Sequence, residues 1–180
     1  MEFTLYYKGK LKSNGNTKEK QRIRNYFSNQ IKKLWDQEPL INFKQFLDDE
    51  TDAFSRQIKG VKFSSIINNE FHYVADIDIV LLHNEPIYKM IKNGGDIDNR
   101  IKTLLDALKM PSRDEFPVML RENNENDRIF CLLHDDSLVS SLKITAKQYL
   151  GSEINDNEVI LLIDVHARKI STLLGGMELP

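Results

Sequence analysis

Cysteine is nearly absent from the sequence: Cys131 is the single thiol among 180 residues. An internal disulfide framework is therefore excluded, and one thiolate cannot form a zinc site alone. No apolar run reaches the length of about 18 residues that a transmembrane helix needs. The first residues lack the charged-then-apolar order of a signal peptide. These absences favour a soluble protein of the reducing cytoplasm, with no membrane partner.

A strong net charge is also lacking, since the total is −2, but the charges are unevenly distributed. The first 35 residues hold nine basic and two acidic residues, a charge of +7, so the other 145 residues carry −9. Such asymmetry is typical of a phosphate-binding face on an acidic body, and equally of a solvated helix surface. The candidate DNA-binding residues of this segment are Lys18, Lys20, Arg22 and Arg24.

The first half of the chain alternates between strand and helix patterns. A helix is expected over residues 17–37, where apolar residues recur every three or four positions and Asn16 with Glu19 forms a capping box. The other elements expected here are a strand over 2–11, a second helix over 42–58, and two strands over 61–67 and 71–83 that read as a hairpin.

The second half begins with an expected loop over residues 84–95. A helix is expected over about 98–109, because its apolar residues share one face and Pro111 stops it. The remaining expectations are an irregular stretch over 111–128, strands over 138–148 and 157–166, and a frayed C-terminal tail. The irregular alternation of strands and helices predicts a single α+β domain with a mixed or antiparallel sheet.

Acidic residues gather at two places in the sequence. On the helix of about 98–109, Asp98, Lys102 and Asp106 follow one another at i, i+4 and i+8 along one edge, and Asp96 lies just ahead. The pair Asp135 and Asp136 leads into a later strand. Oxygen-only carboxylate clusters suit Mg²⁺, which polarises a phosphoryl oxygen and lowers the pKa of a bound water.

A purely structural interpretation of the same residues is also open. Aspartate at a helix N-cap and in the first turn is routine, because it accepts free backbone N–H groups and interacts favourably with the helix dipole. In that case Asp96 and Asp98 cap a helix. The basic first 35 residues would then belong to a non-catalytic module that binds DNA or a protein.

The order Asp-x-Asp-Asn-x-x-Lys, then Asp-Ala-Leu, then Asp-Asp-Ser-x-Val before a strand resembles the RusA-type Holliday-junction endonucleases. The residues that carry the resemblance are Asp96, Asp98, Asn99, Lys102, Asp106, Ala107, Leu108, Asp135, Asp136, Ser137 and Val139. The matched core covers about residues 72–165. The chain differs from that pattern in an insertion around 110–128, in the Gly94-Gly95 pair, and in a larger helical N-terminal region over about 17–58.

The resemblance implies a RusA-like α+β fold and a homodimeric, Mg²⁺-dependent nuclease that cuts a four-way DNA junction during recombination and repair. The metal ligands implied are Asp96, Asp98 and Asp136, with Asp135 as a supporting acid. Lys102 is implied as the catalytic lysine, and Asn99 as a residue that orients the site and contacts DNA.

Three further features have weaker functional interpretations. Asp76 and Asp78 lie on one face of a strand, which is typical of an exposed strand face and also occurs in nucleotidyltransferases. His134 precedes the acidic pair and is interpreted as a strand-end histidine rather than a proton carrier. Cys131 lies among apolar residues and is expected to be a small buried hydrophobe.

Overall fold

The larger of two sheets has four strands in the order β1-β7-β4-β6. Its outer strand β1 (Glu2–Lys10) and its inner strand β4 (Tyr73–His83) both run antiparallel to β7 (Glu158–Lys169), and β6 (Val139–Gln148) pairs parallel with β4. The second sheet consists of β2 (Ser55–Ile58), β3 (Val61–Ile67) and β5 (Ile129–Leu133) in that order. The computed structural model describes residues 1–48, 54–86, 97–116, 128–155 and 158–170.

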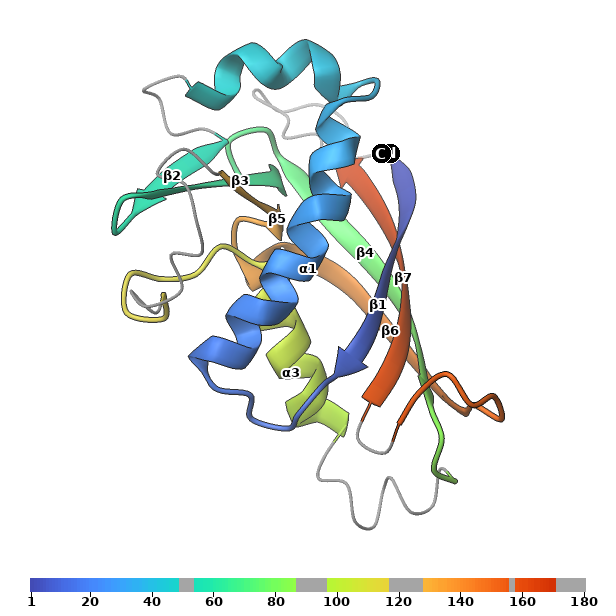
Figure 1. The fold of residues 1–180 in the computed structure, drawn as a ribbon. Helices are drawn as coiled ribbons and strands as arrows, with labels where there is room; N and C mark the ends of the chain where they lie inside the picture. The colour runs from blue at the N-terminus through green and yellow to red at the C-terminus, as the bar shows by residue number, and fades with distance from the viewer. Residues whose placement is uncertain (49–53, 87–96, 117–127, 156–157, 171–180) are drawn as a thin grey trace.

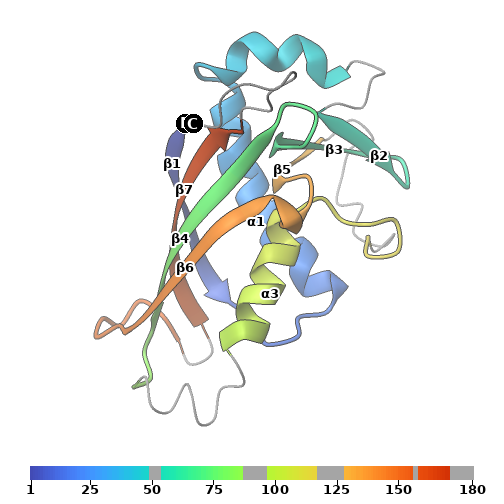
Figure 2. The ribbon, with the colours of Figure 1, turned by 180° about the vertical axis from the view of Figure 1, so that it is seen from behind.

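Two helices, α1 (Thr17–Trp35) and α3 (Ile97–Leu108), lie on the same side of the four-stranded sheet (Figures 1 and 2). Because successive strand residues point to opposite faces, every second side chain faces these helices. Leu5 of β1 and Ile77 of β4 are buried in the same core as Phe27 of α1. The resulting fold is α+β, as the sequence predicts, and the other face of the sheet carries charged side chains together with exposed apolar ones such as Tyr6 and Leu162.

The start of α1 is fixed locally. The side chain of Asn16 accepts a hydrogen bond from Glu19 N at 3.0 Å, and Glu19 Oε2 accepts one from Asn16 N at 3.0 Å. This is the predicted capping box, and it satisfies two backbone donors that a helix end leaves free. Arg24, on the face of α1 that meets α3, ties the two helices together.

Two expectations for the region after α1 are wrong. Residues 42–58 do not form one helix: a 3-10 helix, η1 (Leu40–Asp48), comes first, and Ser55–Ile58 is strand β2. The 61–83 hairpin is also absent, because β3 pairs with β2 and β5 while β4 belongs to the other sheet. The buried Asn68 side chain accepts from Phe71 N at 3.0 Å, and His72 has a φ of 56°, so this turn redirects the chain between the sheets.

The strands expected over 138–148 and 157–166 are confirmed as β6 and β7, and the helix expected over about 98–109 is confirmed as α3. Strand β5 lies within a run of apolar residues that has no alternating pattern, because most of it is buried. Cys131 within it is buried as expected, and burial raises the pKa of its thiol to about 12. Asp96, most of the 84–95 loop and the tail after residue 170 lie outside the described residues.

No helix within the described ranges is long and apolar enough to cross a bilayer.

Candidate active site

The acidic edge of α3 is present, and its residues differ in exposure. Asp98 in the first turn and Lys102 one turn later are exposed, whereas Asp106 in the last turn is 8% exposed. The Asp106 carboxylate forms ion pairs with Lys20 Nζ at 2.7 Å and with Lys109 Nζ at 3.5 Å. Asp106 therefore joins α3 to α1, and the accessible part of this edge is its N-terminal half.

The second acidic pair lies between β5 and β6, at the 3-10 turn η3 (Asp136–Leu138). Asp135 is the N-cap of this turn, and it accepts from Ser137 N at 3.0 Å. Hydrogen bonds from Ser137 hold the pKa of Asp135 below its ordinary value. Asp135 thus caps the turn on which Asp136 lies.

Asp136 is held by a lysine. Lys109 Nζ lies 3.2 Å from Asp136 Oδ1. Partial burial on its own would lower the pKa of Lys109, but the hydrogen bond to Asp136 and the charges of Asp136 and Asp106 outweigh it, so the pKa is raised. Lys109 thus stays an ammonium, and it fixes the Asp136 carboxylate at the C-terminal end of α3.

Asp98 and Asp136 are consequently not neighbours within one chain. Asp136 lies with Lys109 and Asp106, and Asp106 is eight residues along the helix from Asp98, or about 12 Å at ~1.5 Å per residue. Within the described part of the chain, no three His, Cys, Asp or Glu residues are arranged to hold a metal ion. Carboxylate oxygens suit Mg²⁺ chemically. A metal site that uses Asp98 or Asp136 therefore needs further ligands near each of these two residues.

The predicted DNA-binding residues separate into two groups. Lys18 and Arg22 are exposed. Lys20 is paired with Asp106, and Arg24 is 3% exposed, with its guanidinium donating to Lys109 O at 3.1 Å and Asp106 O at 2.7 Å. Arg24 as a DNA contact is therefore wrong, since the residue faces α3 and not solvent.

Asn99, the other residue implied as a DNA contact, lies beside Asp98 in the first turn of α3. Its side chain is partly exposed, and its backbone carbonyl accepts from Thr103 Oγ1 at 3.0 Å. Thr103 also accepts from Gly15 N at 2.9 Å, which brings the start of α1 against the middle of α3. The segment before α1 is thereby anchored beside the exposed half of the acidic edge.

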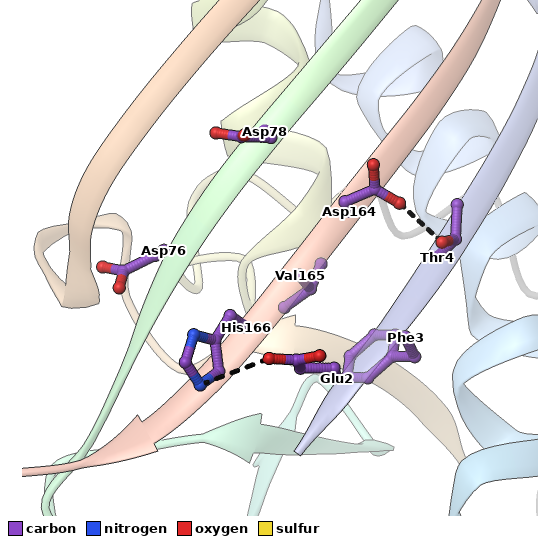
Figure 3. A pocket seen from close by; sticks show the side chains of 8 residues that line it. All are labelled: Glu2, Phe3, Thr4, Asp76, Asp78, Asp164, Val165 and His166. Atoms are coloured by element: carbon purple, nitrogen blue, oxygen red, sulfur yellow. Dashed lines mark hydrogen bonds and ion pairs between the residues drawn. The ribbon is translucent and has the colours of Figure 1, made fainter.

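Figure 3 shows a separate acidic surface on the face of the four-stranded sheet away from the helices. A shallow hollow of about 530 Å³ there is lined by Glu2, Phe3, Thr4, Asp76, Asp78, Asp164, Val165 and His166. Asp76 accepts from Ser140 Oγ and from Arg168 Nε at 3.1 Å, and these contacts lower its pKa. Asp78 pairs with Lys143 at 3.3 Å. Both aspartates lie on the exposed strand face that the sequence favours for them.

His134 lies directly before the acidic pair and contacts Arg56, whose Nη2 is 2.7 Å from His134 Nε2. Burial, followed by the charge of Arg56, lowers the pKa of the imidazole from 6.5. Folding therefore favours the neutral form of the His134 ring. Its contribution to stability is complete above pH 6.5 and is lost as the pH falls through the lower pKa of the folded protein.

We expect the His134 imidazole to titrate below pH 6.5 in the folded protein, as followed by its Cε1 proton in NMR spectra. The change Arg56→Gln should raise the midpoint of the His134 titration only part of the way to 6.5, because burial is the larger cause of the lowered pKa. The signal is assigned by its loss in His134→Gln. A midpoint at or above 6.5 in the unaltered protein would contradict the expectation.

Comparisons of the chain with protein-family models, with curated proteins and with solved structures found no match.

Proposed function

We propose that this protein is a magnesium-dependent endonuclease that cuts branched DNA, with the four-way Holliday junction as its substrate. One observation supports it above the others: Asp98 on α3 and Asp136 on η3 are carboxylates placed on ordered elements, each close to a lysine. Hard oxygen ligands suit Mg²⁺, and nearby ammonium groups suit a phosphate anion. The order of these residues along the chain is that of the RusA-type endonucleases.

The separation of Asp98 from Asp136 shapes the proposal. A homodimer that brings the N-terminal end of one α3 against the η3 turn of its partner would bring both carboxylates to one metal ion. By two-fold symmetry such a dimer contains two equal sites, which suits paired cuts on opposite strands of a junction. We therefore assign Asp98 and Lys102 to one half of each site and Asp136 to the other.

The roles of the side chains follow from their positions. Asp98 and Asp136 would hold Mg²⁺, which when bound polarises a phosphoryl oxygen and lowers the pKa of a water molecule. Lys102 lies one turn from Asp98 on the same helix edge, where its ammonium would offset negative charge on the phosphate. Lys109 orients the Asp136 carboxylate, since the two groups are 3.2 Å apart. Asn99 follows Asp98 directly and would orient its half of the site.

The test is cleavage of an end-labelled synthetic four-way junction in Mg²⁺. We expect Asp98→Asn and Asp136→Asn each to reduce the rate by more than about 100-fold, the loss that removing an outer-shell partner alone can cause. EDTA should abolish cleavage of the junction by the unaltered protein.

Asp164→Asn is the matched control, because it removes an exposed carboxylate from the opposite face of the sheet. It should cut at the unaltered rate. Unchanged cleavage by the Asp98 and Asp136 variants, or cleavage that persists in EDTA, would refute the proposal. Metal-independent binding without any cleavage would favour a non-catalytic DNA-binding module.

A further inference from the structure

The solvent side of α1 carries basic side chains on a single face. Lys18, Arg22, Tyr26 and Lys33 are exposed, and at about 100° per residue they fall within one arc of the helix. Lys32 and Asn29 extend the same face. Figure 1 shows α1 in front of the sheet and Figure 2 shows it behind the strands. The exposure of these residues places them on the side of α1 away from the core.

The acidic residues within α1 and directly after it are paired with lysines. Glu19, the single acid within α1, pairs with Lys12 Nζ at 2.5 Å and completes the capping box at Asn16. Asp36, just after the helix, pairs with Lys44. The exposed side chains of α1 from Lys18 to Lys33 include four basic residues and no acidic one, although the chain as a whole is acidic.

The middle of the face is held in place by packing. Arg22 Nη2 donates to Lys10 O at 2.8 Å and to Tyr7 Oη at 3.3 Å, which fixes the guanidinium while leaving it exposed. Tyr26 is 38% exposed. Its ring packs edge-on against the ring of Tyr7, with 5.0 Å between the ring centroids. A fixed guanidinium beside a fixed phenol forms a more ordered anion site than free lysines do, because less side-chain entropy is lost on binding.

We propose that this face of α1, from Lys18 to Lys33, binds the phosphate backbone of DNA. Its length is about 22 Å at ~1.5 Å per residue, enough to follow several successive phosphates. Its first turn lies beside α3, because Gly15 N donates to Thr103 Oγ1 and Lys20 pairs with Asp106. Lys20 lies on the side of α1 opposite Lys18 and Arg22, so the basic face points away from α3. The choice of DNA as the ligand rests on the proposed function, whereas the assignment of the surface to this face of α1 does not.

The experiment measures binding of duplex and junction DNA in EDTA by fluorescence anisotropy, at several salt concentrations. The triple change Lys18→Gln, Lys32→Gln and Lys33→Gln removes three charges but spares Arg22, which also supports the fold. With a slope of about −0.9 per phosphate contact, we expect the salt dependence to become shallower by about 2.7. At 0.1 M salt the affinity should fall roughly 100-fold or more.

The matched control removes the same charge elsewhere: Lys143→Gln, Lys147→Gln and Lys169→Gln, all exposed positions on β6 and β7. It should change the slope by less than about 0.5. Circular dichroism and thermal unfolding establish that both triple variants fold. Equal losses in the two variants would show a general charge effect and overturn the proposal, as would unchanged binding in the α1 variant.

Failure of this inference and failure of the nuclease proposal give different results. If the α1 variant loses DNA affinity while the unaltered protein never cuts DNA in Mg²⁺, the surface is correct and the nuclease is wrong. If the protein cuts junctions but the α1 variant binds them as before, the nuclease stands and the surface is wrong. If the unaltered protein does not bind DNA at 50 mM salt, the proposed DNA-binding surface is also wrong. The basic face of α1 is then a surface for an acidic protein.

Discussion

Mixing the Asp98→Asn and Asp136→Asn variants should restore DNA cleavage that neither variant supports alone. The reason is the position of the two residues at opposite ends of α3. If each site of a homodimer takes Asp98 from one protomer and Asp136 from the other, a mixed dimer has one site with both defects and one intact site. With random exchange, about a quarter of all sites are intact, so nicking should recover to about a quarter of the unaltered rate.

The measurement is nicking of an end-labelled junction on a denaturing gel, after the two variants have been unfolded and refolded together to exchange protomers. A mixture of Asp98→Asn with Lys102→Met is the matched control. Both residues lie on the same half of the site, so every mixed dimer carries one defect in each site and should stay inactive. Recovery in both mixtures, or in neither, would contradict a site shared between protomers. Sedimentation velocity should show a dimer in each case.

The elements that the sequence predicts correctly are those fixed by local interactions. The capping box at Asn16 and Glu19 and the apolar spacing of α1 lie within one segment, so they can be recognised without knowledge of the fold. The same applies to α3 and to the long strand β4. The 61–83 hairpin is wrong because strand pairing depends on distant partners: β3 meets β5 across more than 60 residues of sequence.

The candidate site divides in the same way. The order of Asp98, Lys102 and Asp106 along a helix edge follows from spacing alone. The placement of Asp136 at the far end of that helix does not, because it depends on the parallel pairing of β4 with β6 and on the short strand β5. Convergence of Asp98 and Asp136 is therefore a property of tertiary or quaternary structure, and sequence order does not determine it.

The inward orientation of Arg24, in contrast, has a signal in the sequence. On a helical projection, Lys20 and Arg24 fall within or beside the arc of Ile23, Phe27 and Ile31, whereas Lys18 and Arg22 fall on the opposite side. A count of basic residues that ignores their angular position around the helix puts all four residues in one group. The charge asymmetry of the first 35 residues thus predicts a basic face correctly only after each residue is assigned to a side of α1.

Replacing Arg24 by methionine should destabilise the fold by about 3 kcal/mol, the usual cost of leaving buried partners of a charged group unpaired. Arg24 is 3% exposed, and its guanidinium donates to the backbone carbonyls of Asp106 and Lys109, which lie at the end of α3 and just after it. The Asp106 carbonyl is among those that a helix end leaves without an intrahelical donor. Methionine fills much of the volume but donates no hydrogen bond, so the loss reports the polar contacts more than a cavity.

Urea unfolding followed by circular dichroism measures this loss, and about 3 kcal/mol corresponds to a fall of roughly 10 °C in Tm for a domain of this size. Lys18→Met, an exposed position on the same helix, should change the free energy of unfolding by less than about 0.5 kcal/mol. Arg24→Lys should recover only part of the stability, because one ammonium lacks the planar fork that reaches both carbonyls. If Arg24→Met were as stable as the unaltered protein, Arg24 would not join α1 to α3. The residue could then turn outward, and DNA contact by Arg24 would again be open to test by salt-dependent binding.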